Sequence, residues 1–129
     1  MEPVRETFDI DAARNSYRRR LADRKTSRHS RWEQARAEAD RLVSMISEKY
    51  SPTRILIWGS LLRPDRFREY SDIDIAVEGI ADAETWSRLE RDALAIATFP
   101  LDIVPLENTH PEHRAQILRR SQTVYPRES

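Results

Sequence analysis

Cysteine is absent from this 129-residue chain, and histidine occurs only three times. A chain without cysteine has no disulfide, no thiolate ligand for zinc and no thiol nucleophile, and a reducing cytosol is its expected location. His29, His110 and His113 are scattered along the sequence, so a histidine-based metal cluster is not expected either. A catalytic metal ion in this chain would therefore have to bind carboxylates.

Long hydrophobic runs are missing as well. No apolar stretch approaches the ~20 residues needed to cross a bilayer, and residues 1–10 lack the apolar segment of a secretion signal. We therefore expect no association with a membrane. Hydrophobic residues make up 39% of the chain and charged residues 34%, which is enough apolar material for one modest core.

Positive charge is concentrated near the N-terminus, although the whole chain has 22 basic and 22 acidic residues. Residues 1–31 contain nine Lys or Arg against five Asp or Glu. One interpretation is a solvated helical arm, because the apolar residues there are too few for a packed face. The other is an arm that contacts an acidic partner surface or RNA. RNA is the less favoured of these two partners. We take residues 1–30 as a basic arm and residues 31–129 as the folded domain.

The first amphipathic helix is expected to begin near Ser30. Ser30 is a candidate N-cap with Glu33 as its capping-box partner, and Ser51 ends the helix because it precedes Pro52. The apolar positions between them recur at steps of three and four residues: Trp32, Ala35, Ala39, Leu42, Val43, Ile46 and Tyr50.

Strands and helices alternate along the rest of the chain. Strands are expected at residues 54–58, 72–77 and 101–104, with a short closing edge strand at 124–125. Further helices are expected at residues 83–97 and from Pro111 onward. This order predicts an α/β (α+β) fold, in which helices flank a small mixed sheet.

Two aspartates alternate with isoleucines in the second expected strand. Side chains two apart on a strand point to the same face, so Asp72 and Asp74 project together while Ile73 and Ile75 face the core. Their mutual repulsion would be relieved by Mg²⁺ or Mn²⁺, which prefer oxygen ligands. The alternative is an exposed strand edge with two outward aspartates, but aspartate is depleted in strands.

A third carboxylate, Asp102, lies among the hydrophobic residues of the third expected strand. If this strand lies beside the second one, three carboxylates converge on one face, as a two-metal site requires. In such a site one ion lowers the pKa of an attacking hydroxyl, and the other holds the triphosphate. Taken alone, Asp102 would more simply be an edge or turn aspartate after Pro100.

A Gly-Ser pair follows the first expected strand. Gly59 permits a tight turn and close approach of the backbone, and Ser60 adds a hydroxyl donor for a phosphate. In the loop that follows, Arg63, Arg66 and Arg68 can neutralise phosphate charge, and Arg63 is our candidate for nucleotide binding. The alternative for these arginines is simple solvation.

Taken together, these residues resemble the minimal nucleotidyltransferases of the DNA polymerase β-like superfamily. The resemblance covers about residues 40–125 and leaves the basic arm outside. It rests on these segments: Trp58-Gly59-Ser60, Ser71 to Val77, Leu101 to Val104, Ile117-Leu118 and Val124-Tyr125. The sequence departs from the family pattern in a longer Gly-Ser to Asp gap and in Pro64, which stands where a glycine is common.

The resemblance implies a nucleotidyltransferase fold and a role for each matching residue. Gly59 and Ser60 would hold the phosphates of ATP or another nucleoside triphosphate. Asp72 and Asp74 would ligate two Mg²⁺ ions, and Asp102 would ligate the catalytic one and help activate the acceptor hydroxyl.

The resemblance also implies a biological setting. Many stand-alone members are antitoxins paired with all-helical HEPN toxins, and some transfer AMP from ATP to a toxin tyrosine. The expected function is therefore transfer of a nucleoside monophosphate, AMP in the first instance, to a hydroxyl of a partner protein in the cytoplasm. The alternative is a non-catalytic antitoxin that neutralises its partner by masking it.

Overall fold

A four-stranded mixed sheet lies at the centre of the protein, whose computed structural model describes residues 9–126. The strand order is β3-β2-β1-β4. The strands are β1 (Arg54–Trp58), β2 (Ile73–Glu78), β3 (Leu101–Pro105) and β4 (Gln122–Tyr125). β2 runs parallel to β3, while β1 is antiparallel to both β2 and β4. The predicted α/β class, with a small mixed sheet between helices, is confirmed.

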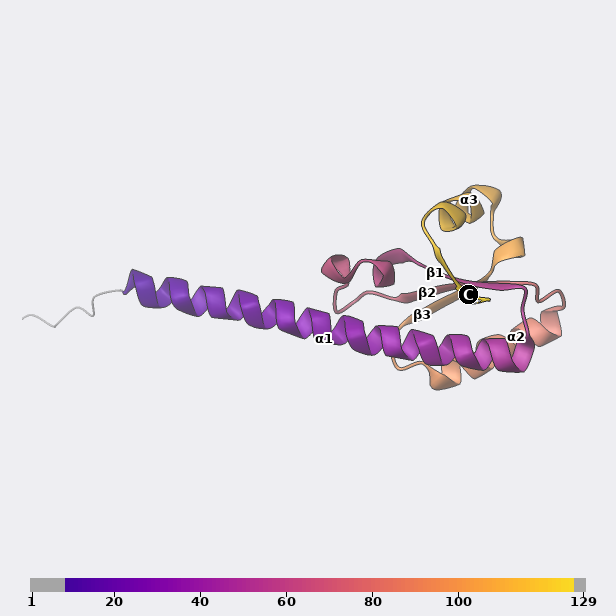
Figure 1. Ribbon diagram of the computed structural model, residues 1–129, viewed down its shortest axis with the longest axis horizontal. Helices are drawn as coiled ribbons and strands as arrows, with labels where there is room; N and C mark the ends of the chain where they lie inside the picture. Colours follow the sequence, from indigo (N-terminus) through magenta and orange to yellow (C-terminus); the bar gives the residue numbers. More distant parts are fainter. Residues whose placement is uncertain (1–8, 127–129) are drawn as a thin grey trace, which may run out of the picture.

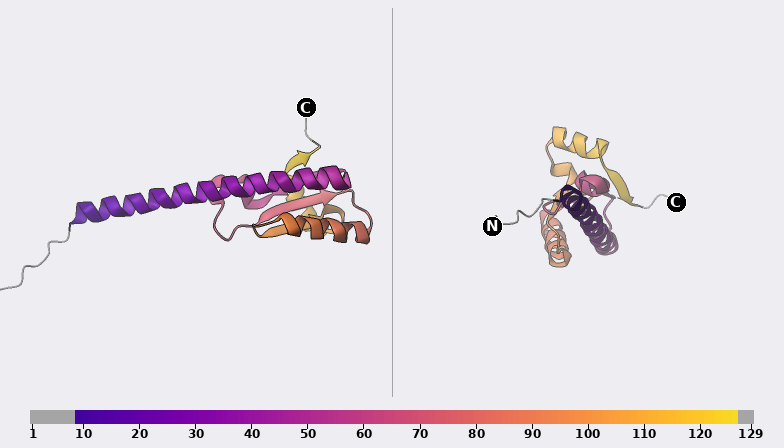
Figure 2. Two further views of the ribbon diagram at one scale, coloured as in Figure 1. Left: turned by 90° about the horizontal axis from the view of Figure 1, so that it is seen from below. Right: turned by 90° about the vertical axis from the view of Figure 1, so that its left-hand side faces the viewer.

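Helices cover both faces of this sheet. The long helix α1 (Ile10–Tyr50) and α2 (Ala83–Ile96) lie on one face, and α3 (Pro111–Arg119) lies on the other, as Figures 1 and 2 show. Short 3-10 turns follow β1 and β3: η1 (Gly59–Leu62) with η2 (Pro64–Arg66), and η3 (Leu106–Asn108). The helices therefore bury the sheet but leave its ends to loops.

Successive side chains of β2 point to opposite faces of the sheet and belong to two separate hydrophobic clusters. Ile73 and Ile75 pack in the cluster that contains the buried residues of α1 and α2. Ala76 packs with Leu56 and Ile117 in a smaller cluster on the α3 side. Because side chains alternate along a strand, Asp74 faces the α3 side with Ala76.

The first helix begins some twenty residues earlier than the sequence predicts. α1 starts at Ile10, with Asp9 as N-cap accepting a hydrogen bond from the Ala12 N–H at 3.0 Å, so the prediction of a start at Ser30 is wrong. No glycine or proline lies between Ile10 and Tyr50, so nothing interrupts the helix at the expected cap. The expected boundary between residues 30 and 31 falls within α1 and stays a prediction.

Beyond the sheet, α1 continues as an exposed arm. In Figure 1 its first half extends past the end of the sheet that carries η1 and η2. Among the described residues, no helix combines the length and the apolar character needed to cross a membrane, and α1 is far too charged to do so. The helical part of the expected basic arm, from Ile10 onward, is therefore continuous with the domain.

A buried carboxylate on α1 fixes the start of β3. Glu38 is fully buried and accepts hydrogen bonds from the Thr98 and Phe99 N–H groups, both at 2.9 Å, and from the Thr98 hydroxyl. Burial alone would raise the pKa of Glu38, but these hydrogen bonds outweigh it and hold the pKa below its ordinary value. The segment that it anchors leads directly into β3.

Replacing Glu38 with alanine should lower the free energy of unfolding by about 1–3 kcal/mol, because it leaves two partly buried N–H donors without an acceptor. Glu33→Ala is the matched control, because the Glu33 side chain lies on the same helix and is 61% exposed. That change should stay within about 0.5 kcal/mol. Urea denaturation of both variants checks this, and equal losses would contradict the anchoring role of Glu38.

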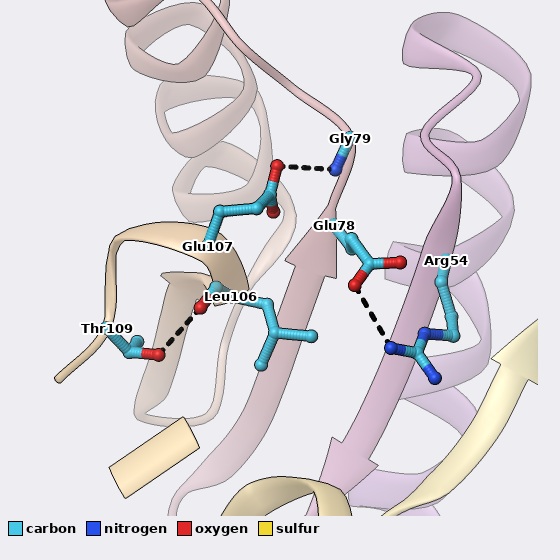
Figure 3. Close-up of polar contacts among 6 residues, drawn as sticks. All are labelled: Arg54, Glu78, Gly79, Leu106, Glu107 and Thr109. Atoms are coloured by element: carbon cyan, nitrogen blue, oxygen red, sulfur yellow. Dashed lines mark hydrogen bonds and ion pairs between the residues drawn. The ribbon is translucent and has the colours of Figure 1, made fainter. Parts of the chain in front are cut away.

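Polar contacts also fix the end of the β1–β2 pair that lies away from the aspartates. Figure 3 shows the ion pair between Arg54 and Glu78 at 3.0 Å and the hydrogen bond from the Gly79 N–H to Glu107, also 3.0 Å. These contacts join β1, β2 and η3. The same register places Trp58 opposite Asp74 at the other end of the pair.

Candidate active site

Two of the three predicted aspartates lie side by side on neighbouring strands. Asp74 of β2 and Asp102 of β3 are direct partners in the parallel register. Their side chains therefore emerge on the same face of the sheet, the one covered by α3. The structure thus brings together two carboxylates that are far apart in the sequence.

Asp72 lies just outside the strand that was expected to contain it. β2 begins at Ile73, so Asp72 is the last residue of the preceding loop, and its side chain is exposed. Its negative charge nevertheless acts on Asp74. Asp72 is therefore close enough to Asp74 to influence its pKa, although the Asp72 backbone belongs to a loop.

Asp74 is the most strongly perturbed carboxyl of this group. Burial, followed by the negative charges of Asp102 and Asp72, raises the pKa of Asp74 to about 7. Within the described residues, no lysine or arginine forms an ion pair with any of the three. The site therefore concentrates negative charge without a cation from the protein.

Gly59 is needed because the Asp74 carboxylate lies directly against it. Gly59 has a φ of +79°, which side-chain-bearing residues rarely adopt, and a Cβ at this position would overlap Oδ2 of Asp74. Trp58, the preceding residue, is the register partner of Asp74. The turn after β1 thus lies directly against the Asp74 carboxylate.

Ser60 and Arg63 lie in the 3-10 turns that follow. Ser60 is in η1, and its carbonyl accepts a hydrogen bond from the Arg63 N–H at 2.9 Å. The Arg63 side chain is exposed and forms no hydrogen bond or ion pair with another residue of the described part. Ser60 thus directly follows the glycine that lies against Asp74, whereas the Arg63 side chain is on the surface of the loop.

The chemistry of the three side chains suits a hard divalent cation, but they do not yet surround one. Among residues 9–126, no three His, Asp or Glu side chains lie close enough together to hold a metal ion. Asp72 and Asp102 are exposed and can turn, while Asp74 is held by Gly59. An oxygen-only donor set, in which burial and then the neighbouring carboxylates raise the pKa of Asp74, fits Mg²⁺ or Mn²⁺.

Some residues that shape this end of the molecule were not identified from the sequence. Glu38 positions the chain before Asp102, and the only sequence signal is an acidic residue within the apolar stripe of a helix. Arg31 joins α1 to the loop before Asp72, because its Nη2 donates to the Glu69 carbonyl at 2.9 Å. No sequence spacing predicts a contact across 38 residues.

The three aspartates do not line either of two hollows on the surface. A hollow of about 950 Å³ lies between α1 and β4, on the other side of β1 from β2 and β3. A cleft of about 680 Å³ lies between the α1 arm and the loop that ends at Asp72. Asp72 and Asp102 are exposed while Asp74 is partly buried, and the site is identified by the chemistry of these carboxylates and by the Gly59 turn.

Comparisons with known proteins identify the family of the chain. No curated protein matches the sequence. A solved structure described as that of a candidate minimal nucleotidyltransferase is similar, with a TM-score of 0.57 and 26% sequence identity over 70% of this chain and 93% of the other. Residues 40–129, which include Gly59, Asp74 and Asp102, match the model of the family described as "Polymerase beta, Nucleotidyltransferase". The chain therefore belongs to the polymerase beta nucleotidyltransferase family.

Proposed function

We propose that this protein transfers a nucleoside monophosphate, AMP from ATP, to a hydroxyl group of a partner protein. Membership of the family supports nucleotidyl transfer in general. The observation that carries the proposal is the pairing of Asp74 with Asp102 beside the Gly59 turn. The nucleotide, the metal ion and the acceptor are the parts that we propose.

Each residue of the site has a distinct task in this proposal. Asp72 and Asp74 would hold both metal ions, and Asp102 would hold one of them next to the acceptor hydroxyl. The Gly59 and Ser60 N–H groups and the Ser60 hydroxyl would contact the phosphates, with Arg63 turning inward from the loop. Bound Mg²⁺ would lower the pKa of the hydroxyl and stabilise charge on the phosphates.

The reaction is a substitution at the α-phosphorus. The acceptor oxygen forms a bond to this phosphorus while the bond to the bridging oxygen of the β-phosphate breaks, and pyrophosphate leaves. The proton of the hydroxyl passes through Asp102 to water. Asp102 is suited to this because its side chain is exposed, whereas Asp74 is partly buried behind Gly59.

The partner that we propose is an all-helical HEPN-type toxin, for which this chain would be the antitoxin. The resemblance of residues 40–125 to minimal nucleotidyltransferases, many of which are antitoxins of such toxins, supports this. We place the pair in the cytoplasm, where a chain without cysteine is expected.

Mass spectrometry of the partner tests the proposal. If a reading frame next to that of this chain encodes a helical protein, that protein is the partner to test, produced alone and together with this chain. We expect co-expression to add one or more AMP units to the partner, and the double variant Asp72→Asn/Asp74→Asn to add none. An AMP adduct that persists with the double variant would overturn the site assignment.

The second candidate is neutralisation by masking, without catalysis. One observation favours it: the three carboxylates do not surround a metal position among the described residues. Masking predicts an unmodified partner that is fully neutralised by the double variant as well as by the wild-type chain. The same experiment therefore separates the two functions.

A further inference from the structure

The arm of α1 presents a stripe of exposed apolar and basic side chains. Ile10, Tyr17 and Leu21 are 56%, 58% and 38% exposed, and their spacing of seven and four residues places them on one face of the helix. Arg24 and Arg28 continue this face at steps of three and four toward the buried stripe of α1. The face that packs on the domain therefore extends into the arm without a covering element.

The inner end of this stripe opens into the cleft of about 680 Å³. Arg24, Arg28 and Arg31 of α1 line it on one side, and Arg68 and Tyr70 line it on the other. Asp23 and Glu69 are also in its lining, so the cleft is basic but not uniformly so. The excess of arginine predicts an anionic ligand.

Side-chain contacts near the base of the cleft join α1 to the loops that follow β1 and precede β2. The Arg31 guanidinium donates to the Glu69 carbonyl and lies 4.7 Å above the Phe99 ring, and the Trp32 indole donates to the Leu61 carbonyl at 2.7 Å. Tyr70 is 82% exposed and lies two residues before Asp72. Figure 1 shows that the arm extends beyond the end of the sheet that carries η1 and η2, and Gly59 and the start of β2 lie at this same end.

The charge and the exposed apolar side chains of the arm restrict which kind of molecule can bind the stripe and the cleft. From Ile10 to Arg31 the arm has eight Lys or Arg and two Asp, so two arms of the same sign would repel each other. A nucleic acid would be attracted by the arginines but would leave the three large apolar side chains without apolar contacts. An amphipathic helix with acidic and apolar residues on one face matches both parts of the stripe.

We infer that this stripe and cleft are the docking surface for an acidic, amphipathic helix of the acceptor protein. The inference rests on the proposed function, because it names the surface that brings the acceptor to the site. Ile10, Tyr17 and Leu21 contact its apolar side chains, while Arg24, Arg28 and Arg68 bind its carboxylates. Docking there holds the acceptor beside Asp72 before its hydroxyl reaches the carboxylates.

Two charge reversals that change the net charge equally test the inference. Arg24→Glu/Arg28→Glu alters the cleft, while Arg18→Glu/Arg19→Glu alters the same arm at residues that do not line it. The probe is the co-expressed helical partner, with its affinity measured by calorimetry and its AMP transfer by steady-state kinetics. We expect the first variant to weaken partner affinity and raise the KM for the partner at least ~10-fold, with unchanged affinity for Mg-ATP.

The control variant Arg18→Glu/Arg19→Glu is expected to change the partner affinity and the KM for the partner less than ~3-fold. Tyr17→Ser/Leu21→Ser should also weaken the partner complex, and this loss should persist at high salt because apolar contacts are not screened. Equal effects of the two charge reversals, or no effect of either on partner affinity, would overturn the inference. Binding of a labelled oligoribonucleotide that both reversals weaken alike would identify nucleic acid as the occupant instead.

These experiments give different results when the docking inference is wrong and when the proposed function is wrong. If the Arg24→Glu/Arg28→Glu chain modifies the partner as well as the wild type, docking is wrong and transfer stands. If the wild-type chain binds the partner without modifying it, transfer is wrong, and the calorimetric comparison still decides the docking surface.

Discussion

Replacing Asp74 with asparagine should lower nucleotidyl transfer by about 10³-fold or more while making the metal-free protein more stable. Activity falls because the amide cannot neutralise the metal ions that the phosphates require. Stability rises because the native carboxylate is held against Gly59 between two other negative charges. Loss of activity with a gain of stability separates a functional carboxylate from one that merely supports the fold.

The stability that Asp74→Asn adds should increase as the pH rises. Because the pKa of Asp74 is raised to about 7 in the folded chain, this group binds its proton more tightly there than in the unfolded chain. Its ionisation therefore lowers the stability of the wild type progressively as the pH rises from about 4 to 7. Below that range Asp74→Asn should have little effect.

Above pH 7 we expect the variant to be more stable by about 1–2 kcal/mol, a value reduced for the solvent screening of a partly exposed group. Thermal unfolding at pH 5 and pH 8, with a chelator present, measures the difference. The same change at Asp65, an exposed aspartate of η2, is the control and should show no such dependence. A variant that is less stable at pH 8 than the wild type would contradict this account of the site.

Replacing Gly59 with alanine is the second change with a large expected effect. The new Cβ would overlap the Asp74 carboxylate, and the φ of +79° would strain the alanine backbone. We expect the free energy of unfolding to fall by about 1–3 kcal/mol and transfer by the folded protein to fall about 10²-fold, because the carboxylate must move. Denaturation and steady-state kinetics measure the two effects.

Gly79→Ala provides a matched control at the far end of β2. Gly79 also has a positive φ, of +100°, and its Cβ would lie 2.6 Å from the Thr53 nitrogen, so the fold should lose at least as much stability. This position is away from Asp74, so transfer per folded molecule should remain near that of the wild type. If Gly79→Ala lowered transfer as much as Gly59→Ala, the effect at Gly59 would be one of stability alone.

Much of the sheet could be predicted because its residues follow simple periods. The alternation of Asp and Ile marks β2, and the apolar residues of β1 mark a strand that is buried on both faces. The sequence predicts that Asp74 and Asp102 are adjacent only if their two strands pair, and it does not specify which strands pair. The parallel pairing of β2 and β3 meets that condition.

The extent of α1 could not be predicted because Ser30 and Glu33 match an N-cap by sequence alone. In the structure the helix passes through them, and Glu33 pairs with His29 one turn earlier. The role of Glu38 was hidden for a similar reason, since a buried acid within an apolar stripe is identified only by donors 60 residues away. Long-range contacts of this kind leave no local pattern.

Anomalous diffraction from crystals grown with Mn²⁺ and a non-hydrolysable ATP analogue tests the central claim most directly. We expect manganese peaks beside the Asp74 and Asp102 carboxylates at about 2.0–2.2 Å, with the phosphates at the Gly59 turn. Asp72 should have turned to coordinate the same ions. Manganese and nucleotide bound elsewhere, with Asp74 and Asp102 left without a metal ion, would contradict it.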